Sequence, residues 1–234
     1  MGYDGSHELF PNLAKAALAA GVTVRRAAEV GVLKYQYSAI REFADAGTPC
    51  DFYEAVPAFC DEIEVALKSR ANARLFRFAL SDTNGNLDLY IAGGGDASTY
   101  AANQTTSPAL VNDNFVPSDD ARVTVECRDF HEVDPGDYDV VTIDVEGGEW
   151  PIVRRMKSRP TILALETHYR RYKNPHLAEI FAWCHENGYV IWYLTRSDTI
   201  FLRGTPPKMS LFRQVERAWK MRNVYGSLAR ASVG

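Results

Sequence analysis

The chain has few cysteines, and they are widely spaced. There are four in 234 residues, with no Cys-x-x-Cys pair among them: Cys50, Cys60, Cys127 and Cys184. A zinc ribbon or a dithiol redox motif needs closely spaced cysteines, so this spacing argues against both. We expect reduced structural thiols, which are typical of cytoplasmic proteins.

Long hydrophobic runs are also absent. No stretch approaches the roughly 20 apolar residues of a membrane-spanning helix, and the N-terminus has no basic segment followed by an apolar one. The apolar fraction of 46% and the charged fraction of 24% are ordinary for a globular protein. We therefore expect a soluble, cytoplasmic protein without a transmembrane segment.

Positive charge is scarce outside the C-terminal segment. The net charge is −4, and residues 208–234 hold six Lys or Arg against one Glu, which leaves −9 for the rest of the chain. An acidic body is a poor match for a polyanion, so we expect no nucleic-acid partner.

The C-terminal segment reads as an amphipathic helix. Within Met209–Tyr225, Phe212, Val215 and Trp219 recur along one helical face and basic residues along another. We expect this helix to pack on the domain or on a second subunit, which would make a homodimer. Contact with a membrane surface is the alternative.

Strand and helix patterns alternate along most of the chain, which is typical of an α/β fold with a mostly parallel sheet. The last two strands are expected to form an antiparallel pair. The expected strands are Arg26–Gly31, Cys50–Ala55, Arg74–Leu80, Tyr138–Asp144, Thr161–Leu165, Tyr189–Leu194 and Thr199–Arg203. The expected helices are Glu8–Ala20, Ser38–Ala46, Pro57–Ser69, Trp150–Lys157 and His176–Asn187.

The middle of the chain departs from this alternation. Leu87–Ile91 and Arg122–Cys127 alternate apolar and polar residues, so they predict two half-exposed strands that could pair. Between them, Gly93–Asp120 is rich in Gly, Ser, Thr, Asn and Pro and predicts a long loop. Because loops of this length in compact domains are commonly functional, we expect a lid over the substrate.

Carboxylates follow the first two expected strands. Glu29 and Gly31 end the first, and Glu54 ends the second 25 residues later. In doubly wound folds a Gly at such a turn lets the backbone approach a cofactor, and an acid near this spacing binds ribose hydroxyls. A solvated turn at Glu29 and a helix-dipole role for Glu54 are the alternatives.

Two further residues follow the third expected strand. Ser81 and Asp82 come where a third loop would face the same crevice, and they could contact an adenine ring. A plain Asx turn before Asn84-Gly85 explains them equally well.

The densest group of ionisable side chains follows two later expected strands. Asp144 and Glu146 end one strand, and Glu166 and His168 end the next. Neighbouring parallel strands end side by side, so these carboxylates and the imidazole could hold a divalent cation or act as a general base. The alternative is that Glu146 and Glu149 only complement a helix dipole, which is the role we assign to Glu149.

The motifs together resemble the FkbM family of S-adenosylmethionine-dependent O-methyltransferases, over roughly residues 26–203. The resemblance rests on Phe52-Tyr-Glu-Ala-Val-Pro57, Phe78-Ala-Leu-Ser-Asp82, Arg128-Asp-Phe130, Ile143-Asp-Val-Glu-Gly-Gly-Glu149 and Ala164-Leu-Glu-Thr-His168. It implies a Rossmann-like, seven-stranded sheet flanked by helices. Residues 1–205 would form this single domain, with residues 206–234 as a basic tail.

The resemblance also implies roles for single residues. Glu29 and Gly31 would line the methionine end of the cofactor, and Glu54 would bind its ribose. Ser81 and Asp82 would lie near the adenine, and Asp144 beside the cofactor. Asp144 and Glu166 would hold Mg²⁺, as acids at these strand ends do in related O-methyltransferases.

The expected reaction is methyl transfer from S-adenosylmethionine to a hydroxyl of a sugar, a glycolipid or another natural product. We expect His168 to act as the base, assisted by Mg²⁺ on Asp144 and Glu166, with Glu146 either as an alternative ligand or in contact with the ligands. Two family positions differ, since Tyr35 replaces a glycine and Thr142 replaces a lysine. A cofactor-binding protein without activity is therefore one alternative, and a nicotinamide-dependent oxidoreductase is another.

Overall fold

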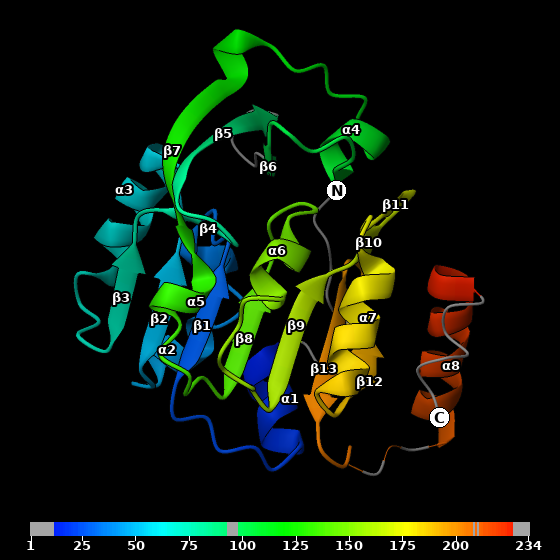
Figure 1. Ribbon diagram of the computed structural model, residues 1–234. Coiled ribbons are helices and arrows are strands. Elements are labelled where there is room, and N and C mark those ends of the chain that lie inside the picture. The colour runs from blue at the N-terminus through cyan, green and yellow to red at the C-terminus, as the bar shows by residue number, and fades with distance from the viewer. Residues whose placement is uncertain (1–11, 93–97, 208, 210, 227–234) are drawn as a thin grey trace.

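The protein is built around one twisted sheet (Figure 1). The computed structural model describes residues 12–92, 98–207, 209 and 211–226. No helix among these residues is long and apolar enough to cross a membrane. The four cysteines are buried and free, as the sequence predicted.

The central sheet has seven strands in the order β12-β13-β9-β8-β1-β2-β3. Six of them run in the same direction, and β13 is antiparallel to both of its neighbours, β9 and β12. This confirms the predicted Rossmann-like α/β class and the antiparallel C-terminal pair. The strands are β1 (Ala27–Val30), β2 (Cys50–Tyr53), β3 (Ala73–Phe76), β8 (Val140–Ile143), β9 (Ile162–Glu166), β12 (Tyr189–Leu194) and β13 (Asp198–Arg203).

The middle strands are apolar runs that are covered on both faces. Every residue of β1, β2 and β8 is buried, as expected of a parallel sheet between helices. In the register, Val30 lies beside both Tyr53 and Ile143. The three strands therefore end at the same level, and the residues that follow them meet at one edge of the sheet.

Helices cover both faces of the sheet (Figure 1). One face packs against α5 (Phe130–Val133), α6 (Glu149–Val153), α7 (Leu177–Glu186) and α8 (Leu211–Tyr225). The other packs against α1 (Leu13–Ala19), the 3₁₀ helix η2 (Tyr35–Tyr37), α2 (Arg41–Asp45) and α3 (Pro57–Leu67). Residues 8–11 of the expected first helix lie outside the described residues.

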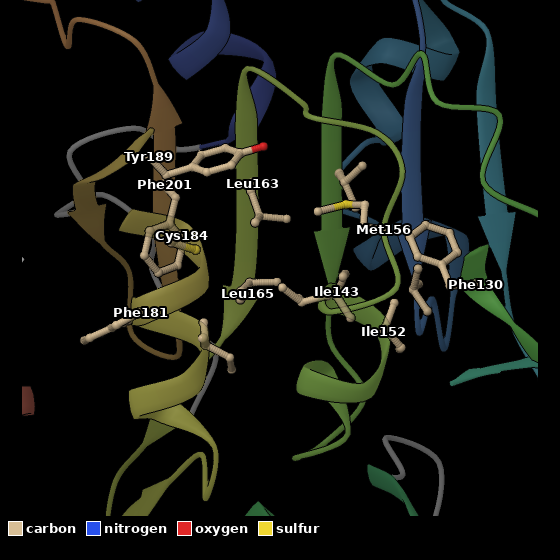
Figure 2. Close-up of a cluster of buried hydrophobic side chains, with 14 of the residues drawn as sticks. Phe130, Ile143, Ile152, Met156, Leu163, Leu165, Phe181, Cys184, Tyr189 and Phe201 are labelled. Carbon is tan, nitrogen blue, oxygen red and sulfur yellow. The ribbon is translucent and has the colours of Figure 1, made fainter. Parts of the chain in front are cut away.

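The core of the first face fixes the two helices nearest the site. Ile143 of β8 and Leu165 of β9 lie between Ile152 of α6 and Phe181 of α7 (Figure 2). Burying one such side chain contributes about 1.5–3 kcal/mol. This packing holds the strand ends and the starts of α6 and α7 in a fixed relation.

The predicted third strand, Arg74–Leu80, is wrong as a single element. The chain leaves the central sheet after β3 and enters a second sheet at β4 (Ala79–Ser81). The break falls at Arg77, which pairs with Asp61 and Glu64 of α3, and at Phe78, which turns toward Tyr53. Local ion pairing and aromatic packing thus accompany the division of a segment that the sequence predicts as one strand.

The second sheet has the order β4-β7-β5-β6, with β5 at Gly85–Ala92, β6 at Ser98–Ala101 and β7 at Arg122–Asp129. Its β5–β7 register pairs Leu87 with Val125, so the predicted pairing of these strands is confirmed. The sheet lies above the carboxyl edge of the central sheet (Figure 1).

The predicted long loop is also partly wrong, because about half of its described residues are ordered into short elements. They form β6, α4 (Pro108–Asn112) and the 3₁₀ helix η3 (Asp119–Ala121), whereas residues 93–97 lie outside the described part. Ser107 caps α4 by accepting from the Leu110 N–H at 3.3 Å. We call residues 98–115 the cap.

The cap is attached to a small hairpin made of β10 (His168–Tyr169) and β11 (Tyr172–Lys173). Asn112 donates from Nδ2 to the Tyr169 carbonyl at 2.9 Å and accepts the Arg171 N–H at 3.0 Å. The cap therefore spans from the second sheet to the end of β9.

Candidate active site

A cavity of about 500 Å³ lies between the carboxyl ends of the parallel strands and the cap. Gly31, Glu54 and Asp144 line it from the strand ends, and Gln104 and Thr106 line it from the cap. Ligands of open α/β sheets bind at this edge, so the cavity is the candidate active site.

A second cavity of about 390 Å³ opens beside the first, between the strand ends and η2. Glu29, Thr142 and Asp198 are among its walls, and Asp144 lines both cavities. Asp144 is therefore exposed to solvent although it lies deep in the molecule. The structure thus separates Glu29 from the cavity that holds Gly31 and Glu54.

Gly31 has a structural reason to be glycine. Its φ is +81°, and a Cβ there would lie 1.8 Å from the backbone oxygen of Asp144. The turn after β1 therefore lies directly against the end of β8. This close contact brings the loop that follows Gly31 to the cavity wall.

Glu54 organises the backbone around the cavity. Its Oε2 accepts the N–H groups of Val32 and Leu33 at 3.1 and 2.9 Å, and its Oε1 accepts those of Ala55 and Val56 at 2.8 and 2.9 Å. One buried carboxylate thus joins the turn after β1 to the start of α3. Ribose hydroxyls would have to share or replace these contacts.

Glu29 is buried and faces the second cavity. It accepts hydrogen bonds from the Ser38 hydroxyl and from the Ala39 N–H, the latter at 2.9 Å. Burial raises its pKa to about 7, although these hydrogen bonds oppose the rise. These contacts also explain why the helix expected from Ser38 begins only at Arg41.

The residues after β4 have different environments. Ser81 lines the first cavity together with Phe78 and Leu80, which provide apolar surface beside it. Asp82 instead forms an ion pair with Arg154, next to α6. The structure brings Ser81 to the cavity wall and turns Asp82 toward a neighbouring helix.

Three carboxylates gather beneath the cavity wall. One oxygen each of Asp144, Glu149 and Glu166 lies within 4.8 Å of the others. Glu149 accepts the N–H groups of Val145 and Gly147 at 3.1 and 3.2 Å, and also bonds to the amide of Asn174. Sequence reasoning assigned Glu149 only a helix-dipole role and missed it as a member of this cluster.

The electrostatics of this cluster are unfavourable in the absence of a cation. Burial and the neighbouring carboxylates raise the pKa values of Asp144 and Glu166 well above their usual range. Burial likewise raises the pKa of Glu149 to about 7. Oε2 of Glu166 is buried and has no hydrogen-bond partner among the described residues. Carboxylate oxygens are the hard donors that divalent cations prefer. The cluster, with Glu166 Oε2 unpaired, therefore fits such a cation.

The turn between β8 and α6 forms one wall of the cavity. Glu146 lies there with a φ of +56° and lines the cavity with Gly147 and Gly148. Gln104 of the cap binds this turn when its amide is oriented to donate to the Glu146 carbonyl at 3.1 Å and to accept the Gly148 N–H at 2.9 Å. The cap is therefore attached directly to the predicted site.

His168 lies outside both cavities. Its Nδ1 is 2.9 Å from the Thr167 hydroxyl and 3.3 Å from the Tyr225 hydroxyl, and its ring packs edge-on against Tyr225. Burial lowers its pKa to about 4, so the imidazole is neutral at pH 7. Another histidine, His176, lines the first cavity at the start of α7. The sequence around His176 gave no indication that this side chain would line the cavity.

Tyr35 does not enter the cofactor crevice. Its ring packs edge-on against Phe52 at 5.7 Å, and its hydroxyl donates to Asp45 at 2.8 Å. It contributes to neither cavity wall among the described residues. The tyrosine at this position therefore leaves the strand-end cavities open.

The sheet order and the strand-end cavities define a Rossmann-like α/β protein with a cofactor crevice at the carboxyl edge. A model of the methyltransferase FkbM domain matches residues 27–191. The chain belongs to the FkbM methyltransferase family, and membership implies S-adenosylmethionine as the methyl donor.

One solved structure is distantly similar to this chain. The precorrin-6y C5,15-methyltransferase from Geobacter metallireducens GS-15 shares 12% identity, and the match covers 80% of this chain and 84% of that one with a TM-score of 0.38. No curated protein matches the sequence.

Proposed function

We propose that the protein is an O-methyltransferase that acts on a hydroxyl of a sugar, a glycolipid or another natural product. The observation that carries this proposal is the meeting of two cavities at Asp144, at the strand edge where the fold binds its cofactor. A long cofactor that extended from one cavity into the other would bring its reactive centre beside the Asp144 carboxylate.

The cofactor placement follows the walls of the two cavities. The methionine end would lie toward Glu29, the ribose at Glu54, and the adenine beside Ser81 and the apolar surface of Phe78. The sulfonium would then lie near Asp144, which lines both cavities. Asp82 would affect the adenine site only indirectly, because its carboxylate is paired with Arg154.

A divalent cation fits the carboxylate cluster. Asp144 and Glu166 would hold it, as the sequence predicted, and Glu149 would join them as a third ligand. Glu146 lines the cavity above and could contribute from there. When bound, Mg²⁺ would supply positive charge that lowers the pKa of an acceptor hydroxyl.

In the transfer itself the acceptor oxygen attacks the methyl carbon, the bond between carbon and sulfur breaks, and S-adenosylhomocysteine leaves. The hydroxyl proton must pass to a base. His176 supports this role by lining the cavity. His168 could serve only if Tyr225 and α8 moved, because they enclose its ring.

The two rival functions differ in what they predict for the cofactor. A binding protein without activity would bind S-adenosylmethionine and transfer no methyl group. Tyr35 gives this rival little support, because it packs away from both cavities. The FkbM match favours methyl transfer over nicotinamide-dependent hydride transfer.

The test is transfer of labelled methyl from S-adenosylmethionine to a panel of hydroxylated acceptors, sugars and glycolipids first, with and without Mg²⁺. We expect a labelled ether product, with turnover at least about 100-fold lower in Asp144→Asn and in His176→Ala. Binding of the cofactor without transfer to any acceptor would favour the inactive protein instead.

A further inference from the structure

The outer face of α8 carries a group of exposed large hydrophobic side chains. Leu211, Phe212, Val215 and Trp219 are each 61–78% exposed there. They recur at helical spacing, so they form one continuous stripe. Contiguous apolar patches of this kind on soluble proteins usually mark an interaction surface.

The inner face of α8 accounts for its position and for much of its charge. Met221 and Tyr225 are buried in the core of the first face. Arg217 donates to the Ile191 carbonyl at 3.2 Å, and Lys220 to the Leu194 carbonyl at 3.1 Å. These bonds cover the edge strand β12, and they turn two basic side chains toward the acidic body.

The direction of these basic side chains distinguishes between two partners for the stripe, a membrane surface and another protein. Helices that lie on membranes place several basic residues beside their apolar face, toward the lipid headgroups. Here Arg217 and Lys220 face the protein, whereas Arg222 is exposed on the side of the stripe. An apolar centre with few charges, rich in Trp, Phe and Arg, is typical of protein interfaces.

The area is sufficient for a small symmetric interface. The four exposed side chains would bury roughly 500–600 Å² per copy, so two copies would reach about the 1,000 Å² of a specific contact. α8 stands at the edge of the molecule, which leaves it accessible to another copy (Figure 1).

We propose that the stripe of α8 packs against α8 of a second copy of this chain, about a two-fold axis. A two-fold contact joins the same surface of both copies and forms a closed dimer. Each copy then buries its stripe against that of the other, and no stripe stays exposed.

The contact would also stabilise the neighbourhood of the candidate active site. The Tyr225 hydroxyl at the end of α8 bonds to Thr167 at 2.7 Å and also to Thr199. Thr167 directly follows Glu166 of the carboxylate cluster. A dimer that holds α8 in place therefore also holds the strand end that carries Glu166.

The test is sedimentation velocity of the full chain between about 1 and 100 µM. We expect twice the monomer mass, and an apparent dissociation constant at least about 100-fold larger in Val215→Asp, which would bury two charges. Val116→Asp is the matched control, because Val116 is 79% exposed and lies outside α8. Circular dichroism should show that both variants stay folded.

A cross-linking measurement provides an independent readout. Ala218→Cys places a thiol on the exposed side of α8, whereas the native cysteines are buried. A short bis-maleimide should link this variant into a dimer and leave the parent chain unlinked. A monomer at all concentrations, or a dimer insensitive to Val215→Asp, would overturn the proposal. So would a monomer that instead co-sediments with phosphatidylglycerol vesicles.

Discussion

At the scale of single residues, the carboxylate cluster is the feature that most needs explanation. Three carboxylates this close together are unfavourable for the stability of the fold, because each disfavours the ionisation of the others. Sequence reasoning placed Asp144 and Glu166 together, since adjacent parallel strands end side by side. It could not place Glu149, whose position depends on how the turn at Gly147-Gly148 folds back.

The cluster predicts how stability depends on pH. The pKa of Glu149 rises from its ordinary value of 4.5 to about 7 on folding. The unfolded chain therefore loses this proton at lower pH than the folded one, so stability falls as pH rises from about 5 to 8. Without added cations, thermal unfolding should show a decreasing Tm over this range, and Glu166→Gln should reduce the decrease. A flat profile would contradict the raised pKa.

Gly31 predicts a large effect for a small substitution. Gly31→Ala adds a methyl group at a positive φ and against the Asp144 oxygen, so we expect a loss of at least about 3 kcal/mol in unfolding free energy. Gly21→Ala is the control, because Gly21 also has a positive φ but no atom within 4 Å of the added carbon. It should cost only about 1–2 kcal/mol. Equal losses in denaturant titrations would show that the contact with Asp144 is unimportant.

At the scale of elements, the parallel strands were predictable and the cap was not. Buried β-branched runs such as Val140–Ile143 identify a strand without knowledge of its neighbours. The cap depends on distant partners, since Gln104 meets the β8–α6 turn and Asn112 meets the β10–β11 hairpin. A composition rich in Ser, Thr and Asn carries no information about such contacts, so residues 98–115 read as loop.

The cap should become more protected when the site is filled. Its residues Asn103–Thr106 line the first cavity, so a bound cofactor would pack against them. Hydrogen exchange of residues 98–112 should slow on addition of S-adenosylmethionine, and should be faster in Gln104→Ala than in the parent chain. Unchanged exchange in both comparisons would contradict a role of the cap as a lid.

The attachment of α8 is a second prediction at this scale. Tyr225→Phe removes the hydroxyl that joins α8 to Thr167 and Thr199, leaving buried polar groups with fewer partners. We expect a loss of about 1–3 kcal/mol in unfolding free energy. Tyr37→Phe, at an exposed position, should change it little. Equal stability of the two variants in urea titrations would show that this network does not hold the helix.

At the scale of the whole molecule, two sheets and one edge helix converge on a single region. The central sheet supplies the carboxylates, the second sheet and the cap cover them, and α8 secures the end of β9 (Figure 1). Alternating patterns in the sequence were sufficient to predict the central sheet. The convergence was not predictable, because it arises from packing between segments more than 50 residues apart, as between Thr167 and Tyr225.

The central claim is that S-adenosylmethionine binds across Asp144 at the strand ends, and calorimetric titration tests it most directly. With and without Mg²⁺, the parent chain should bind the cofactor in the micromolar range. Asp144→Asn should weaken binding at least about tenfold, or 1.4 kcal/mol, whereas Asp137→Asn, at an exposed position away from both cavities, should leave it unchanged. No binding to the parent chain under either condition would contradict the account.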